Sequence, residues 1–191
     1  MKHIALAATL LVLGLASSAH ADGYASAGVA LGANLGTTTG WALDTGYHLG
    51  DTKWIGHAEL GGGQIDDLSE VFGGSESDPF AYGQSHYLRV RAGVAREHYT
   101  STRRWCGFYG LDVGGLGTSA TSGPRGDSLS AQYRQLQVVG RVGGDVGSQH
   151  VRVRLTLSNG FGITERTRVN ERKYETGFQG AELQLALVYR F

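Results

Sequence analysis

The feature that most constrains the fold is an alternation of apolar and polar residues, repeated in segments of about ten residues. Its clearest example is "VRVRLTLS" at 151–158, where Val and Leu alternate with Arg, Thr and Ser. The stretch "AELQLALVYRF" at 181–191 repeats the pattern and closes on an aromatic residue. Successive side chains of a strand point to opposite faces, so each segment predicts a β-strand with one apolar face and one polar or mixed face.

Eight such segments follow one another along the chain, and no stretch after residue 21 has helical periodicity. They lie near 24–33 and at 41–50, 53–60, 87–94, 105–113, 135–146, 151–158 and 181–191. Short turns are predicted at 50–53 and 147–150, and longer loops at about 64–84, 118–131 and 163–177. Pro79 and Pro124 fall in these loops, where a missing N–H group interrupts no ladder.

The first 21 residues have the layout of a secretory signal peptide. Lys2 and His3 precede an apolar run that is too short to span a bilayer, and Ala19-His20-Ala21 provides a small-residue cleavage pattern. We expect cleavage after Ala21, which leaves 22–191 as one exported domain. The single cysteine, Cys106, excludes an internal disulfide, and a formal net charge of zero gives no electrostatic reason to expect nucleic acid as a partner.

These features together predict an all-β fold, an eight-stranded antiparallel transmembrane up-and-down β-barrel. In hydrocarbon every backbone N–H and C=O group must be paired within the protein, so a β-protein there has to be a closed barrel. An even strand number, with short turns at one end and long loops at the other, is the plan of bacterial outer-membrane barrels. Aromatic residues near strand ends, among them Trp41, Trp54 and Trp105, suit the interfacial girdles of such barrels. The alternative, a soluble sandwich or lipocalin-like barrel, would bury the apolar face and expose the charged one.

The chain resembles the small eight-stranded outer-membrane barrels of Gram-negative bacteria, the OmpA transmembrane domain and OmpX group, over the whole of 22–191. The last strand, with Tyr189 third from the end and Phe191 last, resembles the family's barrel-assembly signal. The resemblance implies that the barrel-assembly machinery recognises these two side chains. It also implies an outer-membrane location among lipid and lipopolysaccharide. We expect a monomer without a cofactor or a metal ion.

If the apolar face meets lipid, the polar face lines the lumen. Its charged residues form a predicted salt-bridge network with His48 and His57 nearby: Asp44, Glu59, Asp112, Asp145 and Glu182 against Arg89, Arg91, Arg141, Arg152, Arg154 and Arg190. Buried charges persist when they are paired, and an eight-stranded barrel has just enough interior room for side chains. We therefore interpret this set as a plug that fills the lumen.

Turn lengths predict the register of two hairpins. A two-residue turn at Ser148-Gln149 would place Val146 opposite Val151 and Asp145 opposite Arg152, which predicts a direct Asp145–Arg152 ion pair. A turn at Asp51-Thr52 would place Leu49 opposite Trp54. It would also place Asp44 opposite Glu59. Two facing carboxylates need a cation between them or one must hold a proton, and Arg89 and Arg91 are the candidates for that cation.

The function that these observations favour is non-enzymatic, a structural or surface-interaction role through the extracellular loops. An enzyme is the first alternative, because "TLSN" at 156–159 resembles the His-x-Ser-Asn motif of the lipid A deacylase group. Thr156 stands where that group has its histidine base, which leaves Ser158 a poor nucleophile, so no catalytic residue is assigned. A narrow solute channel is the second alternative.

The predicted loops differ in charge. The 64–84 segment carries five acidic residues and no basic one, so it is a candidate for binding a divalent cation or a partner. The 163–177 segment carries Arg166, Arg168, Arg172 and Lys173, which suit the phosphates of lipopolysaccharide. An extracellular partner could therefore bind through 64–84, 118–131 or 163–177.

Overall fold

The computed structural model describes residues 22–33, 37–65, 85–101, 104–122, 129–169, 172–174 and 179–191. Its strands are β1 Gly23–Ala33, β2 Thr37–His48, β3 Trp54–Ile65, β4 Ser85–Tyr99, β5 Trp105–Ser122, β6 Leu129–Gly147, β7 Val151–Val169, β8 Arg172–Tyr174 and β9 Gln179–Arg190. Within these ranges there is no helix long and apolar enough to cross a membrane. The predicted signal peptide at 1–21 lies outside the described residues.

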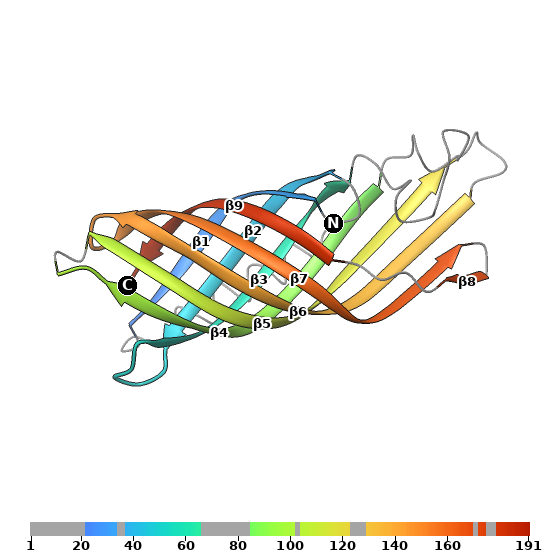
Figure 1. Cartoon of the computed structure of the whole chain (residues 1–191). Helices are drawn as coiled ribbons and strands as arrows, with labels where there is room; N and C mark the ends of the chain where they lie inside the picture. The colour runs from blue at the N-terminus through green and yellow to red at the C-terminus, as the bar shows by residue number, and fades with distance from the viewer. Residues whose placement is uncertain are drawn as a thin grey trace.

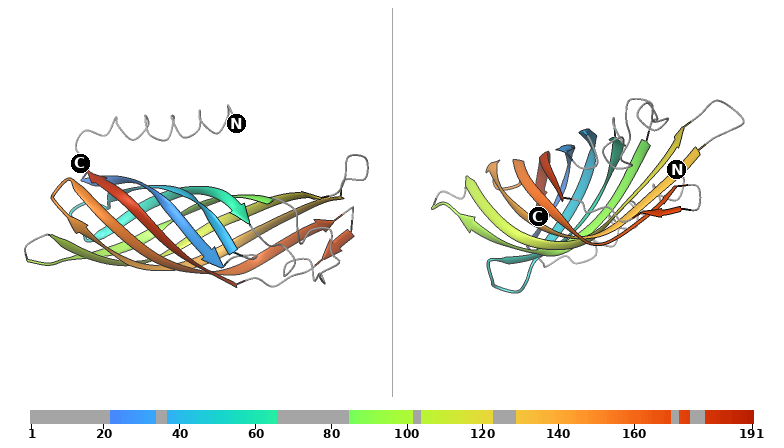
Figure 2. Two further views of the ribbon diagram at one scale, coloured as in Figure 1. Left: turned by 90° about the horizontal axis from the view of Figure 1, so that it is seen from above. Right: turned by 45° about the vertical axis from the view of Figure 1, so that its right-hand side comes forward.

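Eight of the strands form the wall of one closed antiparallel barrel (Figures 1 and 2). Each strand from β1 to β7 pairs with the next, β7 pairs with β9, and β9 pairs with β1, which closes the ring. The three-residue β8 pairs with the far end of β7 and is not one of the eight strands of the barrel wall. The predicted eight-stranded barrel is therefore confirmed.

The barrel is inverted relative to a soluble protein, with its apolar side chains outside. Leu111, Leu187 and Val29 are 63%, 60% and 57% exposed, whereas the arginine Arg89 is 2% exposed. A water-soluble barrel would reverse this distribution, because burial of apolar surface drives its folding. The soluble alternative is thus excluded, and the apolar outer face is a surface for lipid.

The short turns, the start of β1 and the end of β9 lie at one end of the barrel. Backbone hydrogen bonds join Gly23 and Phe191 reciprocally at 3.2 and 3.1 Å, and Gly50 adopts a left-handed φ of 62° in the β2–β3 turn. Outer-membrane barrels keep their short turns in the periplasm, so this is the periplasmic end. Trp54 and Trp105 begin strands there with 40% and 61% exposure, as an aromatic girdle requires.

Two of the three predicted loops were wrong, because strands occupy much of them. The 118–131 segment belongs largely to β5 and β6, and the 163–177 segment contains the end of β7 and all of β8. Figures 1 and 2 show β5, β6 and β7 running well past the other strands. Outside the membrane both faces of a strand meet water, so the apolar alternation that marks a strand is lost while the backbone pairing continues. The third predicted loop, apart from residues 64 and 65 at the end of β3, lies outside the described residues, as do both prolines.

Candidate functional site: the charged lumen

The described part of the lumen holds equal numbers of buried carboxylates and guanidinium groups. The carboxylates are Asp44, Glu59, Glu97, Asp112, Asp145 and Glu182, and the arginines are Arg89, Arg91, Arg141, Arg152, Arg154 and Arg190. Each of these residues is at most 8% exposed. The alternation of the strands places all of them on the inner face, as the sequence predicted for eleven of the twelve.

The extracellular half of the lumen contains a cluster of four residues. Arg89 donates its Nε–H group to Glu59 Oε1 at 2.9 Å and pairs with Glu182 through Nη1. Arg91 Nη1 lies 3.5 Å from a carboxylate oxygen of each of the same two acids. Two positive charges thus neutralise two negative ones.

The middle of the lumen is organised around Arg141. Its Nη2 lies 3.2 Å from Asp44 Oδ2, and its Nη1 lies 3.6 Å from Asp112 Oδ2 and 2.9 Å from His57 Nδ1. His57 lies between this guanidinium group and two carboxylates, with Nε2 2.9 Å from Asp112 Oδ1 and Nδ1 3.5 Å from Asp44 Oδ1. The ring therefore links Arg141 with both acids.

Tyr24 completes this middle cluster from β1. Its hydroxyl group donates to Asp44 Oδ2 at 2.8 Å, and its ring is stacked 4.1 Å from the guanidinium carbon of Arg154. The ring lies across Gly46, where an added Cβ would come within 2.6 Å of Tyr24 Cε1 and 2.7 Å of Ile55 Cγ2. Glycine at this inward position leaves the space that the Tyr24 ring fills.

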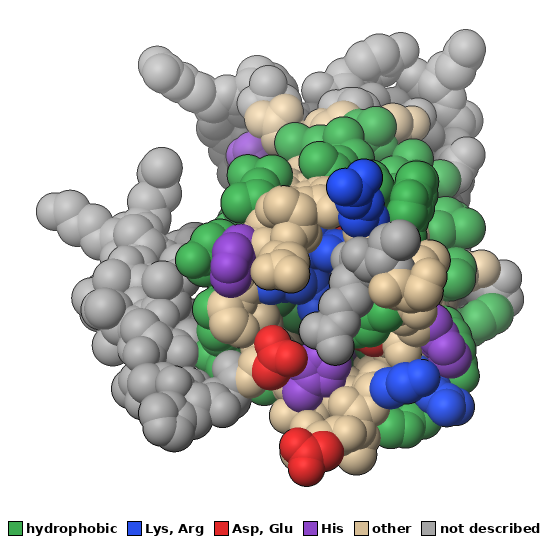
Figure 3. Space-filling model, turned by 90° about the vertical axis from the view of Figure 1, so that its left-hand side faces the viewer, with side chains coloured by type: hydrophobic (Ala, Val, Ile, Leu, Met, Phe, Trp, Pro, Cys, Tyr) green, Lys and Arg blue, Asp and Glu red, His purple; other side chains and the backbone are tan. Residues whose placement is uncertain are grey.

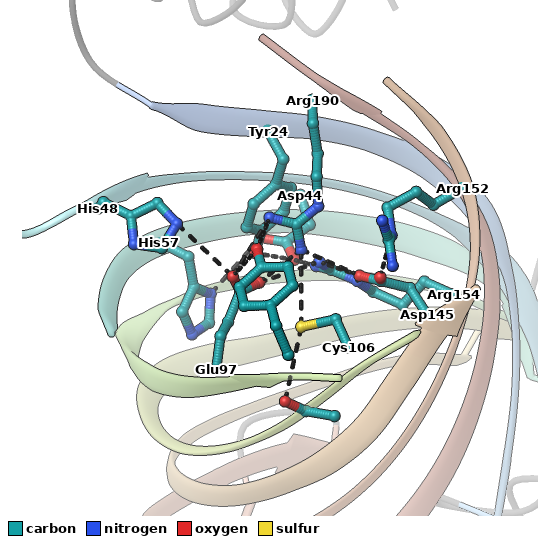
Figure 4. Close-up of polar contacts among 12 residues, drawn as sticks. Tyr24, Asp44, His48, His57, Glu97, Cys106, Asp145, Arg152, Arg154 and Arg190 are labelled. Atoms are coloured by element: carbon teal, nitrogen blue, oxygen red, sulfur yellow. Dashed lines mark hydrogen bonds and ion pairs between the residues drawn. The ribbon is translucent and has the colours of Figure 1, made fainter. Parts of the chain in front are cut away.

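The periplasmic half contains the densest cluster, shown in Figure 4. Arg190 and Glu97 form a two-pronged pair, with Nη2–Oε1 and Nη1–Oε2 separations of 2.6 and 3.2 Å. Asp145 accepts hydrogen bonds from Arg152, from Arg154 at 3.0 Å and from Arg190 at 3.1 Å. Bidentate and charge-assisted bonds of this kind are among the strongest available to side chains.

Ion pairs at three levels of the lumen join strands on opposite sides of the ring. In the circular order of the eight wall strands, β4 lies four places from β9, and β2 lies four places from β6. Arg89–Glu182 and Glu97–Arg190 connect β4 with β9, and Asp44–Arg141 connects β2 with β6. Side chains that meet from opposite walls span the full width of the lumen.

The two predicted hairpin registers had different outcomes. Asp44 does lie opposite Glu59. In the β6–β7 hairpin the prediction was wrong by two residues: Asp145 lies opposite Arg154, and Val146 opposite Val153. The turn is longer than assumed, because Ser148 N–H donates to the carbonyl of Val151.

The ion pairs that were predicted from these registers form only in part. The Asp145–Arg152 ion pair forms despite the shift, since an arginine two residues away on the same face still reaches the carboxylate. Arg89 and Arg91 neutralise Glu59 as predicted, but the cations within reach of Asp44 are Arg141 and Arg154.

Glu97, the sixth carboxylate, was not predicted from the sequence. The predicted strand stopped at Val94, whereas β4 continues to Tyr99. Glu97 has the same parity as Arg89 and Arg91, and extending the alternation by three residues would have found it. Without Glu97 the predicted interior had five acids for six arginines, an imbalance that was itself a signal.

Glu97, Cys106 and Asp145 each offer one potential metal-ligand atom, and these atoms lie within 4.8 Å of one another. The same two carboxylates are already bound by arginines, and Arg190 Nη2 lies 3.9 Å from Cys106 Sγ. A metal ion would have to displace a guanidinium group and add positive charge beside the others. The arrangement suits arginine better than a metal.

The residues of the proposed assembly signal and those of the motif behind the enzyme alternative lie on opposite faces of the wall. Tyr189 and Phe191 are 54% and 43% exposed on the outside at the periplasmic end, where Phe191 meets the Tyr47 ring edge-on at 5.8 Å. Ser158 is 7% exposed and lies opposite Arg141 in the lumen, with Thr156 on the same inner face.

Comparison with solved structures finds this fold in small outer-membrane barrels. Neisserial surface protein A (NspA) matches with a TM-score of 0.58 and 14% identity, over 90% of this chain and 97% of its own. Ail, the attachment invasion locus protein of Yersinia pestis, matches with a TM-score of 0.54 and 15% identity over 90% and 99%. For the N-terminal β-barrel domain of Pseudomonas aeruginosa OprF the values are 0.51 and 12%, over 89% and 100%.

No family model and no curated protein matches the sequence. At these low identities the structural matches establish the fold alone. They confirm the resemblance to small outer-membrane β-barrels and support an outer-membrane location for this chain.

Proposed function

We propose that this outer-membrane β-barrel is a non-enzymatic surface protein that acts through its extracellular ends while its lumen stays sealed. The observation that carries the proposal is the set of ion pairs between opposite walls. Arg89–Glu182, Asp44–Arg141 and Glu97–Arg190 occupy three successive levels of the lumen. A permeating ion would have to break a buried pair at each level, which costs several kcal/mol. The buried ion pairs therefore make a solute channel the less favourable alternative.

The extended ends of β6, β7 and β8 supply a candidate interaction surface. In the backbone register Arg134 lies opposite Arg166, and Arg168 lies opposite Lys173. Positions 166 and 168 are two apart on one strand, so these four positions share one face of the sheet. Arg134 is exposed and has the outward parity of Leu136, which is 42% exposed. Arg134 therefore lies on the outer face, directly above the apolar belt, and the backbone register places positions 166, 168 and 173 on the same face of the sheet.

Like charges directly opposite each other destabilise a pair of strands, so this surface needs an anionic counterpart. The height above the apolar belt favours the phosphate groups of lipopolysaccharide in the surrounding leaflet. Ail, which has the same fold, has been crystallised with the heparin analogue sucrose octasulfate. That complex provides a precedent for an anionic saccharide on a barrel of this shape.

The test compares Arg134→Gln/Arg168→Gln with Arg104→Gln, which removes an exposed base at the periplasmic end. The measurement is binding of each purified barrel to lipopolysaccharide and to its dephosphorylated form across a salt series. We expect salt-sensitive binding to phosphorylated lipopolysaccharide that the double variant weakens and Arg104→Gln preserves. Equal binding by both variants would refute the surface. Binding to sulfated glycan but not to lipopolysaccharide would also refute it in this form and point to an external ligand.

The second part of the proposed surface role is binding of an extracellular partner through the loops. Replacing 66–84 with a Gly-Ser linker should leave the heat-dependent gel shift of the folded barrel unchanged and reduce cell adhesion or serum-protein binding. A strain that carries the replacement and adheres like wild type would remove this acidic loop from the proposal. The gel shift is the control for folding.

Three expectations complete the proposal: signal peptide cleavage after Ala21, assembly through Tyr189 and Phe191, and a monomeric barrel. N-terminal sequencing of outer-membrane fractions should begin at Asp22. A mature chain that retains residues 1–21 would contradict the first expectation. Cross-linking in the membrane should yield monomers, and a discrete dimer would contradict the third.

The enzyme alternative finds little support in the chemistry of Ser158. A serine needs a base to become a nucleophile, and its neighbour on the same face at the motif position is Thr156. A lumen-facing hydroxyl group beside Arg141 is also remote from an acyl chain outside the barrel. Release of fatty acid from lipid A by wild type, lost in Ser158→Ala, would overturn the non-enzymatic assignment.

A further inference from the structure

The periplasmic mouth of the barrel is hollowed into a cavity of about 460 Å³. In the end-on view of Figure 3, basic side chains and histidines lie at this end of the barrel together with acidic ones. A volume of this size is within the usual range of small-molecule sites. The cavity lies on the periplasmic side of the sealed lumen, so a solute reaches it without crossing the barrel.

The lining of the cavity is predominantly basic. Five of its side chains are cationic or become so on protonation, against one carboxylate: His48, Lys53, His150, Arg152 and Arg190 against Asp22. Two of these cations are shared with acids behind the floor, since Arg190 pairs with Glu97 and Arg152 with Asp145. His48 Nε2 also lies 3.6 Å from Glu97 Oε2, so Lys53 and His150 carry most of the excess positive charge. Within the described part of the chain Lys53 forms no ion pair. A cleft with an excess of one charge concentrates ions of the opposite sign.

The donors reach the cavity from three separate elements. His48 and Lys53 flank the β2–β3 turn, His150 and Arg152 flank the start of β7, and Arg190 ends β9. Both imidazoles are fixed in the same way: His48 Nδ1 lies 3.2 Å from the carbonyl oxygen of Thr52, and His150 Nδ1 lies 3.2 Å from that of Arg190. In each ring Nδ1 is engaged by a backbone carbonyl, and Nε2 is the remaining ring nitrogen.

We propose that this cavity binds a phosphate group from the periplasmic side. A phosphate monoester offers three terminal oxygens, which suits donors that converge from three directions, whereas a carboxylate offers two. Guanidinium and ammonium groups form charge-assisted hydrogen bonds with phosphate oxygens. The volume leaves room for a small organic group attached to the phosphate. The phosphate could belong to a soluble ester or to a phospholipid headgroup of the inner leaflet, and the chemistry of recognition is the same.

The experiment uses the full barrel in phosphatidylcholine nanodiscs, titrated with glycerol 3-phosphate. Binding is followed by NMR shifts of backbone amides in the turns at 48–54 and 147–152. Saturable shifts should appear in wild type and in Arg104→Gln, a variant at the same end whose side chain does not line the cavity. Lys53→Gln/His150→Gln should weaken binding by about tenfold, the effect expected for loss of one charge-assisted hydrogen bond.

A second arm places phosphatidylglycerol in the nanodiscs without the soluble ester. Shifts of the same amides in that arm alone would identify the headgroup as the source and support the site. The absence of saturable shifts in both arms would overturn the proposal. Equal weakening by Arg104→Gln and by the double variant would overturn it too, because it would indicate general attraction to a basic end. A heat-dependent gel shift verifies that each variant is folded.

Discussion

At the scale of single residues, Glu97 has the greatest influence on the interior. Its carboxylate receives the two-pronged bond from Arg190, a hydrogen bond from the Tyr99 hydroxyl group and a contact with His48 Nε2 at 3.6 Å. It is 1% exposed and is the residue that brings the buried charges to six against six. Removing one member of a buried pair leaves the other uncompensated, which costs more than the pair contributes.

Glu97→Gln should therefore lower the free energy of unfolding by about 3–5 kcal/mol. Urea unfolding of the barrel in lipid, read from the gel shift, measures the change. Asp51→Asn, in the exposed β2–β3 turn, is the matched control and should stay within about 0.5 kcal/mol of wild type. Adding Arg190→Gln to Glu97→Gln should cost less than the two single changes summed. Coincident unfolding curves for Glu97→Gln and Asp51→Asn would contradict the role of Glu97.

The Gly46 position gives a second prediction at this scale. Gly46→Val should displace the Tyr24 ring from Asp44 and destabilise the barrel by about 1–3 kcal/mol through overpacking. Gly56→Val is the control, since Leu49 is the sole neighbour of an added Cβ there, at 3.3 Å. The same urea series tests both variants, and equal stability for the two would remove steric crowding as the reason for glycine at 46.

At the scale of elements, the sequence predicted strands well where lipid touches them and poorly elsewhere. In β7 the alternation of Val151 to Leu157 with inward Arg and Thr is complete, because one face meets hydrocarbon and the other meets charge. Beyond Ile163 the apolar alternation disappears from the sequence, and the strand resembles a loop there. The β6–β7 register also escaped prediction, since it depends on a turn whose length the residues at 147–150 leave open.

The candidate site was predictable for a related reason. Parity assigns a side chain to the inner face without knowledge of the register, so eleven lumen charges could be found from the sequence. Partner choice depends on which strands face each other across the ring, and that is a property of the closed barrel. For this reason the pairing of Asp44 with Arg141 from the opposite wall could not be derived from neighbouring strands.

The last strand gives the prediction at this scale. Deleting Phe191 should slow insertion, because we propose that the assembly machinery reads its side chain with that of Tyr189, and because reciprocal hydrogen bonds join Phe191 to Gly23 at the closing seam. Pulse-chase labelling with the gel shift as readout gives the rate. Phe161→Ala, which removes an aromatic ring that is 51% exposed away from this end, should insert normally. Normal insertion without Phe191 would contradict the proposed signal.

At the scale of the whole molecule, the barrel combines an apolar exterior with a polar, ion-paired interior. Six carboxylates and six guanidinium groups balance within the described lumen, and His57 lies between Arg141 and the carboxylates of Asp44 and Asp112. Pairs that connect opposite walls at three levels tie the ring together, and we propose that they close it to solutes. The surfaces left for interaction are then the extended extracellular strands with their loops and the periplasmic mouth.

Conductance in planar lipid bilayers tests this central claim most directly. The wild-type barrel, inserted in 1 M KCl, should give no discrete current steps, whereas a general porin in the same bilayer provides the positive control. Glu97→Gln/Arg190→Gln, which removes the periplasmic pair, should also stay closed, because the Arg89–Glu182 and Asp44–Arg141 levels remain intact. Stable, reproducible steps from the folded wild-type protein would contradict the sealed lumen and with it the proposed function.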